Sequence, residues 1–406
     1  MASGKNLISQ PSRRDLLAMA LAAGASTTAL GQTSGPPVRV GGTLSLTGPL
    51  AATGAIHKIV GDLFVQEANK KQGMLGRPIE WVLLDDQSKP DLARTLYERL
   101  ITVDKVDLLI GPYATANILS AMSVAQRYNK VLVHSTFGIP KLATYDRHFP
   151  GWPIGFTPED TVSNMVLDGI LSTGKQVKTF AVVTSKFPSV HFLAVGARDV
   201  FKKRGLTENL YLEFEFGARD FGPIAARVRE ANPDILYMGA IGLEGNQLLE
   251  ALEKINYTPK NHMYVYPSPG QLAQSPLGKD ALSLTIYEDL PTFSDNPEAA
   301  TFARLYREAA TKAGFPFVDP ETQAGAGYSS WQILTGAVNA TKSLNDDVLT
   351  AHLKKNGADT IVGKVRFDGP QNYGDDLMRL KQVQDGKWAI VWPKQVATPG
   401  KTIIIK

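Results

Sequence analysis

The most informative absence in this chain is cysteine, because none of its 406 residues is one. Without thiols the protein can have no disulfide, no cysteine nucleophile and no thiolate ligand for a metal ion. The lipid anchor of a bacterial lipoprotein also needs a cysteine. These three kinds of chemistry and that anchor are therefore excluded.

A concentrated block of one charge is also missing. The net charge is +4, and residues 1–31 hold three basic side chains and one acidic side chain, which leaves +2 for the rest of the chain. No basic run interleaved with aromatic residues follows, although surfaces that bind nucleic acid or acidic membranes have such runs. We therefore expect no nucleic-acid partner.

Long apolar runs and metal-ligand spacings are absent as well. No segment after residue 31 is long and apolar enough to cross a bilayer, so the protein is not expected to be embedded in a membrane. The histidines lie at positions 57, 134, 148, 191, 262 and 352 without an H-E-x-x-H spacing, and no G-x-S-x-G sequence occurs. We predict no metal, no cofactor and no catalytic residue, and hence no enzyme.

The first 31 residues have the pattern of an export signal. The pair Arg13-Arg14 precedes a short run rich in Ala and Leu, which ends in small residues near Gly31. The segment resembles a twin-arginine signal, with Leu16 where that signal usually has Phe. We predict cleavage near Gly31 and a periplasmic product; the alternative is a tail that happens to contain two arginines.

The rest of the chain alternates between apolar segments and amphipathic ones. The first half predicts strands at 38–46, 78–85, 107–111 and 130–134 and helices at 55–71, 91–103 and 115–128. After a pause at 145–160, rich in Pro, Gly and aromatics, it predicts strands at 179–184, 210–216, 234–238 and 263–266 and helices at 191–204, 222–230 and 244–255. Such alternation is typical of α/β proteins with doubly wound parallel sheets, here in two lobes.

The C-terminal third predicts how the two lobes are connected. It contains an expected crossing strand at 286–290, helices at 298–313 and 322–345, and short strands at 364–367, 378–384 and 388–392, read as a hairpin that returns to the second lobe. The predicted N-terminal lobe is 38–157 with 287–363, and the predicted C-terminal lobe is 158–286 with 364–406. A hinge of several strands would join them.

Residues 41–54, with the sequence GGTLSLTGPLAATG, show where a ligand is expected. A strand that passes through a Gly/Pro loop into a helix places backbone amides and a helix N-terminus at the carboxyl edge of a sheet, where open α/β sheets bind ligands. The loop has no Lys or Arg and no G-x-x-x-x-G-K-[ST] spacing, so it is a poor phosphate site. We expect a small ligand in the cleft where the carboxyl edges of both sheets meet.

Five segments carry a resemblance to a known family: SLTGPLAATG, LLDDQSKPDLARTL, LLIGPYAT, VLVHSTFG and GKVRFD. In their order and spacing, from residue 38 to residue 394, they resemble the branched-chain amino-acid-type periplasmic binding proteins of ABC transporters, which have the type I fold. The resemblance implies a non-enzymatic receptor that closes around a small ligand and docks on a membrane permease. We expect it to act as a monomer.

The resemblance also implies ligand positions in this sequence. Thr115 falls where a hydroxyl holds the ligand carboxylate, and Phe187 where an aromatic ring caps the ligand from the second lobe. The family's second aromatic becomes Ile241 or Gly242. The loop after the fourth strand, which is about one residue shorter here than in the family, supplies Ser135, Thr136, Phe137 and Gly138. In the loop at residues 266–270, Ser268 takes the place of the family's acid. Tyr113 is a further aromatic candidate.

Ser268 in place of the acid predicts the class of ligand. In the family that acid pairs with the α-amino group, and burying an ammonium without it costs about 3–5 kcal/mol. A micromolar receptor has only about 8 kcal/mol in total. We therefore predict a carboxylate with a flat or aromatic body and no amino group, such as a benzoate or a phenylpropanoid acid, unless Glu244 or Asp160 takes over.

Other interpretations stay open beside this one. The chain could be a receptor for branched-chain or other amino acids, an amide-type ligand sensor of the same fold, or a hydrolase on the same plan. Asp85-Asp86 resembles a catalytic carboxylate pair, but we interpret it as closing a strand and capping the next helix. Thr115 can be both a helix N-cap and a ligand contact.

Overall fold

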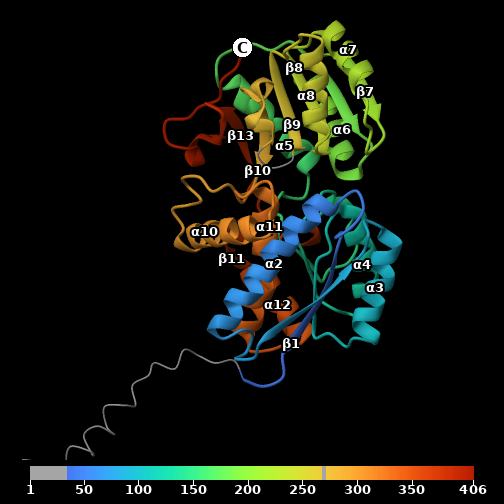
Figure 1. Ribbon diagram of the computed structural model, residues 1–406, viewed down its shortest axis with the longest axis vertical. Coiled ribbons are helices and arrows are strands. Elements are labelled where there is room, and N and C mark those ends of the chain that lie inside the picture. Colours follow the sequence, from blue (N-terminus) through green and yellow to red (C-terminus); the bar gives the residue numbers. More distant parts are fainter. Residues whose placement is uncertain (1–33, 268–270) are drawn as a thin grey trace, which may run out of the picture.

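The computed structural model describes residues 34–267 and 271–406 and shows two α/β lobes stacked end to end (Figure 1). The predicted export signal lies outside the described residues. None of the helices in the described part of the chain has the length and apolar character that a membrane span requires. The two-lobed α/β prediction is confirmed.

The first lobe is built on a five-stranded parallel sheet with the order β2-β1-β3-β4-β5. β1 pairs with β2 along its whole length, from Val38 opposite Ile79 to Leu44 opposite Asp85. Because the strands are parallel, the loops after β1, β3 and β4 lie at one edge of the sheet. The strands are β1 (Val38–Leu44), β2 (Ile79–Asp85), β3 (Leu108–Ile110), β4 (Leu132–His134) and β5 (His148–Pro150).

The second lobe has a seven-stranded mixed sheet with the order β14-β13-β10-β9-β8-β6-β7. Its parallel part is continued by the antiparallel hairpin β13–β14, which pairs with β10. β8 is buried along almost its whole length, as expected for a central strand covered on both faces. The strands are β6 (Thr179–Ser185), β7 (Thr207–Phe214), β8 (Ile235–Gly242), β9 (Asn261–Pro267), β10 (Leu282–Thr285), β13 (Arg379–Gln384) and β14 (Lys387–Trp392).

Helices cover both sheets. In the first lobe α3 packs on α4 and α2 packs on α11, and in the second α5 packs on α6 and α7 on α8 (Figure 1). The helices of the first lobe are α2 (Ala51–Lys71), α3 (Pro90–Thr102), α4 (Thr115–Arg127), α10 (Pro297–Lys312), α11 (Thr322–Thr341) and α12 (Asp346–Asn356). Those of the second are α5 (Pro158–Leu171), α6 (Pro188–Lys203), α7 (Gly222–Ala231), α8 (Glu244–Lys254) and the short α9 (Gln271–Gln274).

Two of the segments that connect the lobes run side by side. Ile154 forms an isolated antiparallel bridge with Asp376, and the Leu377 N–H donates to the Pro153 carbonyl at 2.9 Å. A third connection leaves β10 toward α10. The lobe boundaries predicted from the sequence remain a prediction.

The third connection differs from the expected crossing strand. Residues 286–290 are not a strand; the strand is β10, which ends just before them. The chain leaves the sheet there because the Ile286 N–H donates to the Thr322 hydroxyl at the start of α11 (2.9 Å) rather than to a neighbouring strand.

Three further expectations were wrong in detail. The predicted helix 322–345 ends early: α11 stops at Thr341, where Lys342 has a positive φ, and a separate helix, α12, begins at Asp346 with Asn345 as its side-chain cap. Residues 364–367 do not join the C-terminal hairpin; β12 (Gly363–Val365) instead pairs with β11 (Ala358–Thr360). The irregular stretch 145–160 contains β5, and α5 follows it unpredicted.

The loop in residues 41–54 is organised by two aspartates at the end of β2: Asp85 is its last residue and Asp86 follows it. Asp86 is fully buried and accepts hydrogen bonds from Thr43 Oγ1 (2.8 Å) and Ser45 Oγ (2.7 Å), and Asp85 accepts from the Leu46 N–H (2.9 Å). The pair closes β2 as we expected, but it does not cap the next helix, because α3 has Lys89 at its N-cap and no side-chain cap hydrogen bond.

Candidate ligand-binding site

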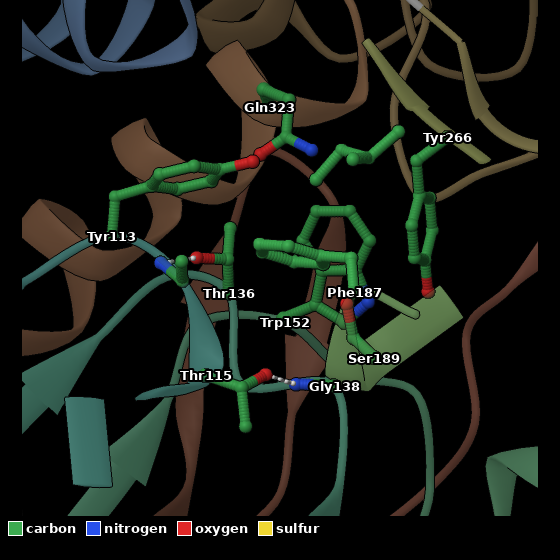
Figure 2. Close-up of a pocket in the computed structure, with 11 residues that line it drawn as sticks. Tyr113, Thr115, Thr136, Gly138, Trp152, Phe187, Ser189, Tyr266 and Gln323 are labelled. Carbon is green, nitrogen blue, oxygen red and sulfur yellow. Dashed lines mark hydrogen bonds between the residues drawn. The ribbon is translucent and has the colours of Figure 1, made fainter. Parts of the chain in front are cut away.

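A small cavity lies where the two lobes meet (Figure 2). The first lobe contributes the loops after β3 and β4 and the first turn of α11, and the second contributes the start of α6 and the ends of β8 and β9. The free space inside it is well below the range for ligand pockets, so the cavity has to widen to hold a small molecule. The lining residues are Tyr113, Ala114, Thr115, Thr136, Gly138, Trp152, Phe187, Ser189, Ile241, Tyr266 and Gln323.

Two threonine hydroxyls tie the first-lobe loops together at this cavity. Thr115 Oγ1 accepts from the Gly138 N–H at 3.2 Å, and Thr136 Oγ1 accepts from the Ala114 N–H at 3.3 Å (Figure 2). A hydroxyl that accepts from an amide still has its own proton to donate. Both side chains can therefore donate a hydrogen bond to an anionic oxygen in the cavity.

Two helices begin at the cavity without a side-chain cap. α4 starts at Thr115 and α6 starts just after Phe187, and neither has a side-chain acceptor for its first amides. Uncapped N-termini offer backbone N–H donors and a favourable dipole to an anion. The start of α11 differs, because the Glu321 carboxylate accepts from the Gln323 N–H.

The lobes touch beside these helix starts. A Cβ atom added at Gly138 would lie only 2.7 Å from Ser189 Cβ, so the loop after β4 approaches α6 as closely as it does because residue 138 is glycine.

Aromatic side chains form the walls of the cavity. Trp152 and Tyr266 are in edge-to-face contact with ring centroids 5.5 Å apart, and Phe187 packs on Phe216 at 4.9 Å. Tyr113 is 2% exposed, and burial raises the pKa of its phenol, so the phenol stays protonated. These walls suit a flat apolar body.

No lysine, arginine, aspartate or glutamate belongs to the described lining. Glu244, one of the two acids considered as a replacement, accepts from Ser185 Oγ (3.2 Å) and from the Ile241 and Gly217 amides (3.1 and 3.3 Å) and does not line the cavity. Asp160, the other, is exposed and also lies outside the lining.

The structure brings most of the predicted ligand residues together. Two do not line this cavity: Ser135 faces a separate cavity inside the first lobe, and Phe137 is fully buried in the core, with its carbonyl accepting from Tyr373 Oη at 3.1 Å. Ser268 lies outside the described residues. The predicted residues that do line the cavity are Tyr113, Thr115, Thr136, Gly138, Phe187 and Ile241. Their contact with a ligand stays a prediction.

Several lining residues were not among the predicted ones: Trp152, Ser189, Tyr266 and Gln323. The Trp152 segment gave one signal, since it lies in the aromatic-rich pause between the two wound halves. The sequence gave no signal for Gln323, because its place depends on how α11 packs between the lobes.

Within the described residues, no group of three or more His, Asp or Glu side chains is placed to hold a metal ion. His134 is buried, and its Nε2 is hydrogen-bonded to His148 Nδ1 at 2.9 Å.

Comparison with known proteins identifies the family. The family model described as "Periplasmic binding protein" matches residues 37–387. A relative named Leu/Ile/Val-binding protein homolog 2, from Brucella abortus, is 24% identical over 370 residues, which cover 89% of this chain and 95% of the relative.

Two solved structures have the same fold. A leucine binding protein from Thermotoga maritima has a TM-score of 0.74 at 20% identity, over 89% of this chain and 99% of that one. An ABC transporter solute binding protein from R. palustris, in complex with benzoate, has a TM-score of 0.74 at 18% identity, over 91% and 99%. The chain therefore belongs to the periplasmic binding proteins, non-enzymatic substrate-binding components of ABC transporters with the type I fold.

Proposed function

We propose that this protein is the receptor of an ABC importer for a small aromatic carboxylate without an α-amino group, such as a benzoate or a phenylpropanoid acid. The observation that carries the proposal is a cavity with hydroxyls, uncapped helix starts and aromatic walls, but no charged side chain in its described lining.

The carboxylate of the ligand binds at the first-lobe loops. Thr115 and Thr136 each have a hydroxyl proton to donate, and the amides at the start of α4 lie beside them. Hydrogen bonds to a charged acceptor are stronger than those between neutral groups. An anion is thus held without an arginine.

The body of the ligand lies between Tyr113, Phe187, Trp152 and Tyr266 (Figure 2). Aromatic rings favour edge-to-face or offset contacts with another ring, in addition to the apolar area they bury. The solved benzoate complex of the R. palustris protein supports this ligand class, since it has the same fold.

An amino acid is the second candidate, favoured by the names of the Brucella and Thermotoga proteins. Its ammonium would need a carboxylate partner, and the described lining has none. The residue at the family's acid position, Ser268, has no ionisable group.

The ligand is captured by closure of the hinged lobes around the cavity, and the permease recognises the closed state. We further propose that residues 1–31 direct twin-arginine export and are removed near Gly31, and that the periplasmic receptor is a monomer. The mass of the mature protein tests the cleavage, and its sedimentation tests the monomer.

Calorimetry on the exported protein tests the ligand class. Benzoate, cinnamate, leucine and isoleucine are titrated separately into protein that has been unfolded and refolded to remove bound ligand. We expect micromolar or tighter binding of at least one aromatic acid and none of the amino acids. Tight leucine binding without binding of either aromatic acid would refute the proposal.

A further inference from the structure

A second small cavity lies inside the first lobe, between its sheet and the helices α2 and α11; we call it the inner cavity. It includes Ser135, which the sequence suggested as a ligand residue and which the ligand cavity does not use. Its lining residues are Thr43, Leu44, His57, Trp81, Ile110, Gly111, Ser135, Gly327, Ser330 and Trp331.

The inner cavity adjoins the ligand cavity. Ser135 and Thr136 are neighbours in one loop and line the inner and the ligand cavity respectively. On α11, Gln323 lines the ligand cavity and Gly327, one turn later, lines the inner one. Tyr113 forms part of the partition, because its ring packs against the ring of His57 with centroids 5.2 Å apart.

Two polar atoms of the inner-cavity lining have no hydrogen-bond partner within residues 34–267 and 271–406. They are His57 Nε2 and Trp81 Nε1. His57 is 5% exposed, and a buried polar group without a partner destabilises a protein. The nearby hydroxyls of Thr43 and Ser330 are already used to donate to Asp86 Oδ2 (2.8 Å) and to the Ala326 carbonyl (3.0 Å).

The chemistry of these two atoms indicates what they can bind. Burial lowers the pKa of His57 to about 4, so the ring is neutral at pH 7 and has one N–H and one acceptor nitrogen. Trp81 can only donate. No residue of the lining carries a formal charge at this pH. A hydroxyl, which both accepts and donates, complements this pair, whereas an ionised group would be buried without a counter-charge.

We propose that the inner cavity is a subsite of the ligand cavity, which receives an uncharged hydroxyl of the ligand. The inference rests on the proposed function and narrows its ligand class to hydroxylated aromatic acids. Tyr113 moves aside to admit the hydroxyl, and Trp81 and His57 bind it. The alternative occupant is ordered water, which also pairs with buried polar atoms.

Two substitutions alter the inner cavity in different ways. Trp81→Phe removes the N–H donor and keeps an aromatic ring. Gly327→Ala fills space, because its Cβ would lie 2.9 Å from His57 Nδ1 and must displace that ring. Gly336→Ala is the matched control, since it lies on the same helix and its Cβ meets nothing within 4 Å.

The experiment is calorimetry with pairs of acids of increasing length. Benzoate, phenylacetate and cinnamate are each compared with their 4-hydroxy forms, and 4-methoxybenzoate serves as a substituent that cannot donate. For at least one length, the wild type is expected to bind the hydroxylated acid about fivefold more tightly, the size of effect that one buried hydrogen bond produces. The preference should fall below twofold in Trp81→Phe and Gly327→Ala and persist in Gly336→Ala.

The outcomes separate this inference from the proposed function. If the wild type binds aromatic acids but prefers no hydroxylated form, or if both substitutions leave the preference intact, the inner cavity holds only water and the inference is wrong. If the wild type binds no aromatic acid at all, the proposed function and this inference fail together.

Discussion

The lobes of this protein meet at two cavities of opposite character. The ligand cavity has no charged side chain in its described lining, whereas a larger groove, which we call the hinge groove, is rich in them. The hinge groove lies between the α10–α11 region and the β10–β13–β14 edge. Its charged residues are Glu288, Asp289, Arg307, Asp319, Glu321, Lys381 and Lys387.

Five of these seven residues form ion pairs with one another. Lys381 forms an ion pair with Glu288, with their side chains 5% and 7% exposed, and its Nζ lies 4.5 Å from the centre of the Trp388 ring. Arg307 pairs with Asp289 and Asp319. The comparison indicates that this fold tolerates desolvated charge where a partner is built in. In the ligand cavity, the threonine hydroxyls and the helix N-termini can donate hydrogen bonds to an anion, but its described lining has no acidic side chain for a cation.

The largest expected effect comes from breaking the buried pair of the hinge groove. Lys381→Met leaves Glu288 as an uncompensated buried charge, which should lower the free energy of unfolding by about 3–5 kcal/mol. The double variant Lys381→Met/Glu288→Gln should recover most of the loss. Urea denaturation measures both, and a single variant as stable as the wild type would contradict the account.

Titration of Glu321 should produce the next largest effect. Glu321 is 7% exposed; burial, and secondarily the nearby Glu288, raise its pKa to about 7, while Lys381 opposes the shift. The folded state holds this proton more tightly than the unfolded state does. The resulting contribution of Glu321 to the free energy of unfolding is therefore full below about pH 4.5 and is lost as pH rises through 7. The loss amounts to about 3 kcal/mol.

The measurement compares the wild type with Glu321→Gln between pH 5 and pH 8. The stability of the wild type relative to the variant should decrease as pH rises, and the difference between the two proteins removes the contributions of other titrating groups. Parallel stability curves for the two proteins would show that Glu321 does not titrate in this range.

A carboxylate introduced into the ligand cavity would have no basic side chain in the described lining to pair with, unlike Glu288 and Asp289 in the hinge groove. Gln323→Glu is expected to weaken binding of an aromatic carboxylate about thirtyfold, because like charges in such a site repel by about 2 kcal/mol. The same change on the exposed surface of α4, Gln126→Glu, should leave calorimetric affinity within twofold. Equal effects of both changes would mean that Gln323 is not near the bound anion.

The smallest expected effect comes from removing one hydroxyl. Thr115→Val keeps the shape of the side chain but takes away the donor to the ligand and the acceptor for the Gly138 N–H, so affinity should fall about tenfold. Thr115→Ser retains the hydroxyl and should bind nearly as the wild type does. If both variants bind equally, the carboxylate is held elsewhere.

The alternation of buried strands and helices was sufficient to predict most elements of the two sheets. It was insufficient in two places. The Ile286 N–H donates to Thr322, so the chain leaves the sheet there, and α11 ends before Asn345 caps a separate helix. The short strand β5 lies in a segment whose Pro and Gly content hid it.

The candidate site was predictable where a residue lies close after the end of a strand, as Thr115 at the start of α4 does after β3 and Thr136 does after β4. The direction of each side chain was not predictable from the sequence. Three adjacent residues point to different places: Thr136 lines the ligand cavity, Ser135 lines the inner cavity, and Phe137 is buried in the core. Gln323 and Trp152 reach the cavity only because distant segments pack there, which no local pattern records.

Mass spectrometry of small molecules released from the protein, purified from its own periplasm without refolding, tests the central claim most directly. The account predicts an aromatic carboxylate that has no α-amino group. Release of leucine or another α-amino acid in stoichiometric amount would contradict it.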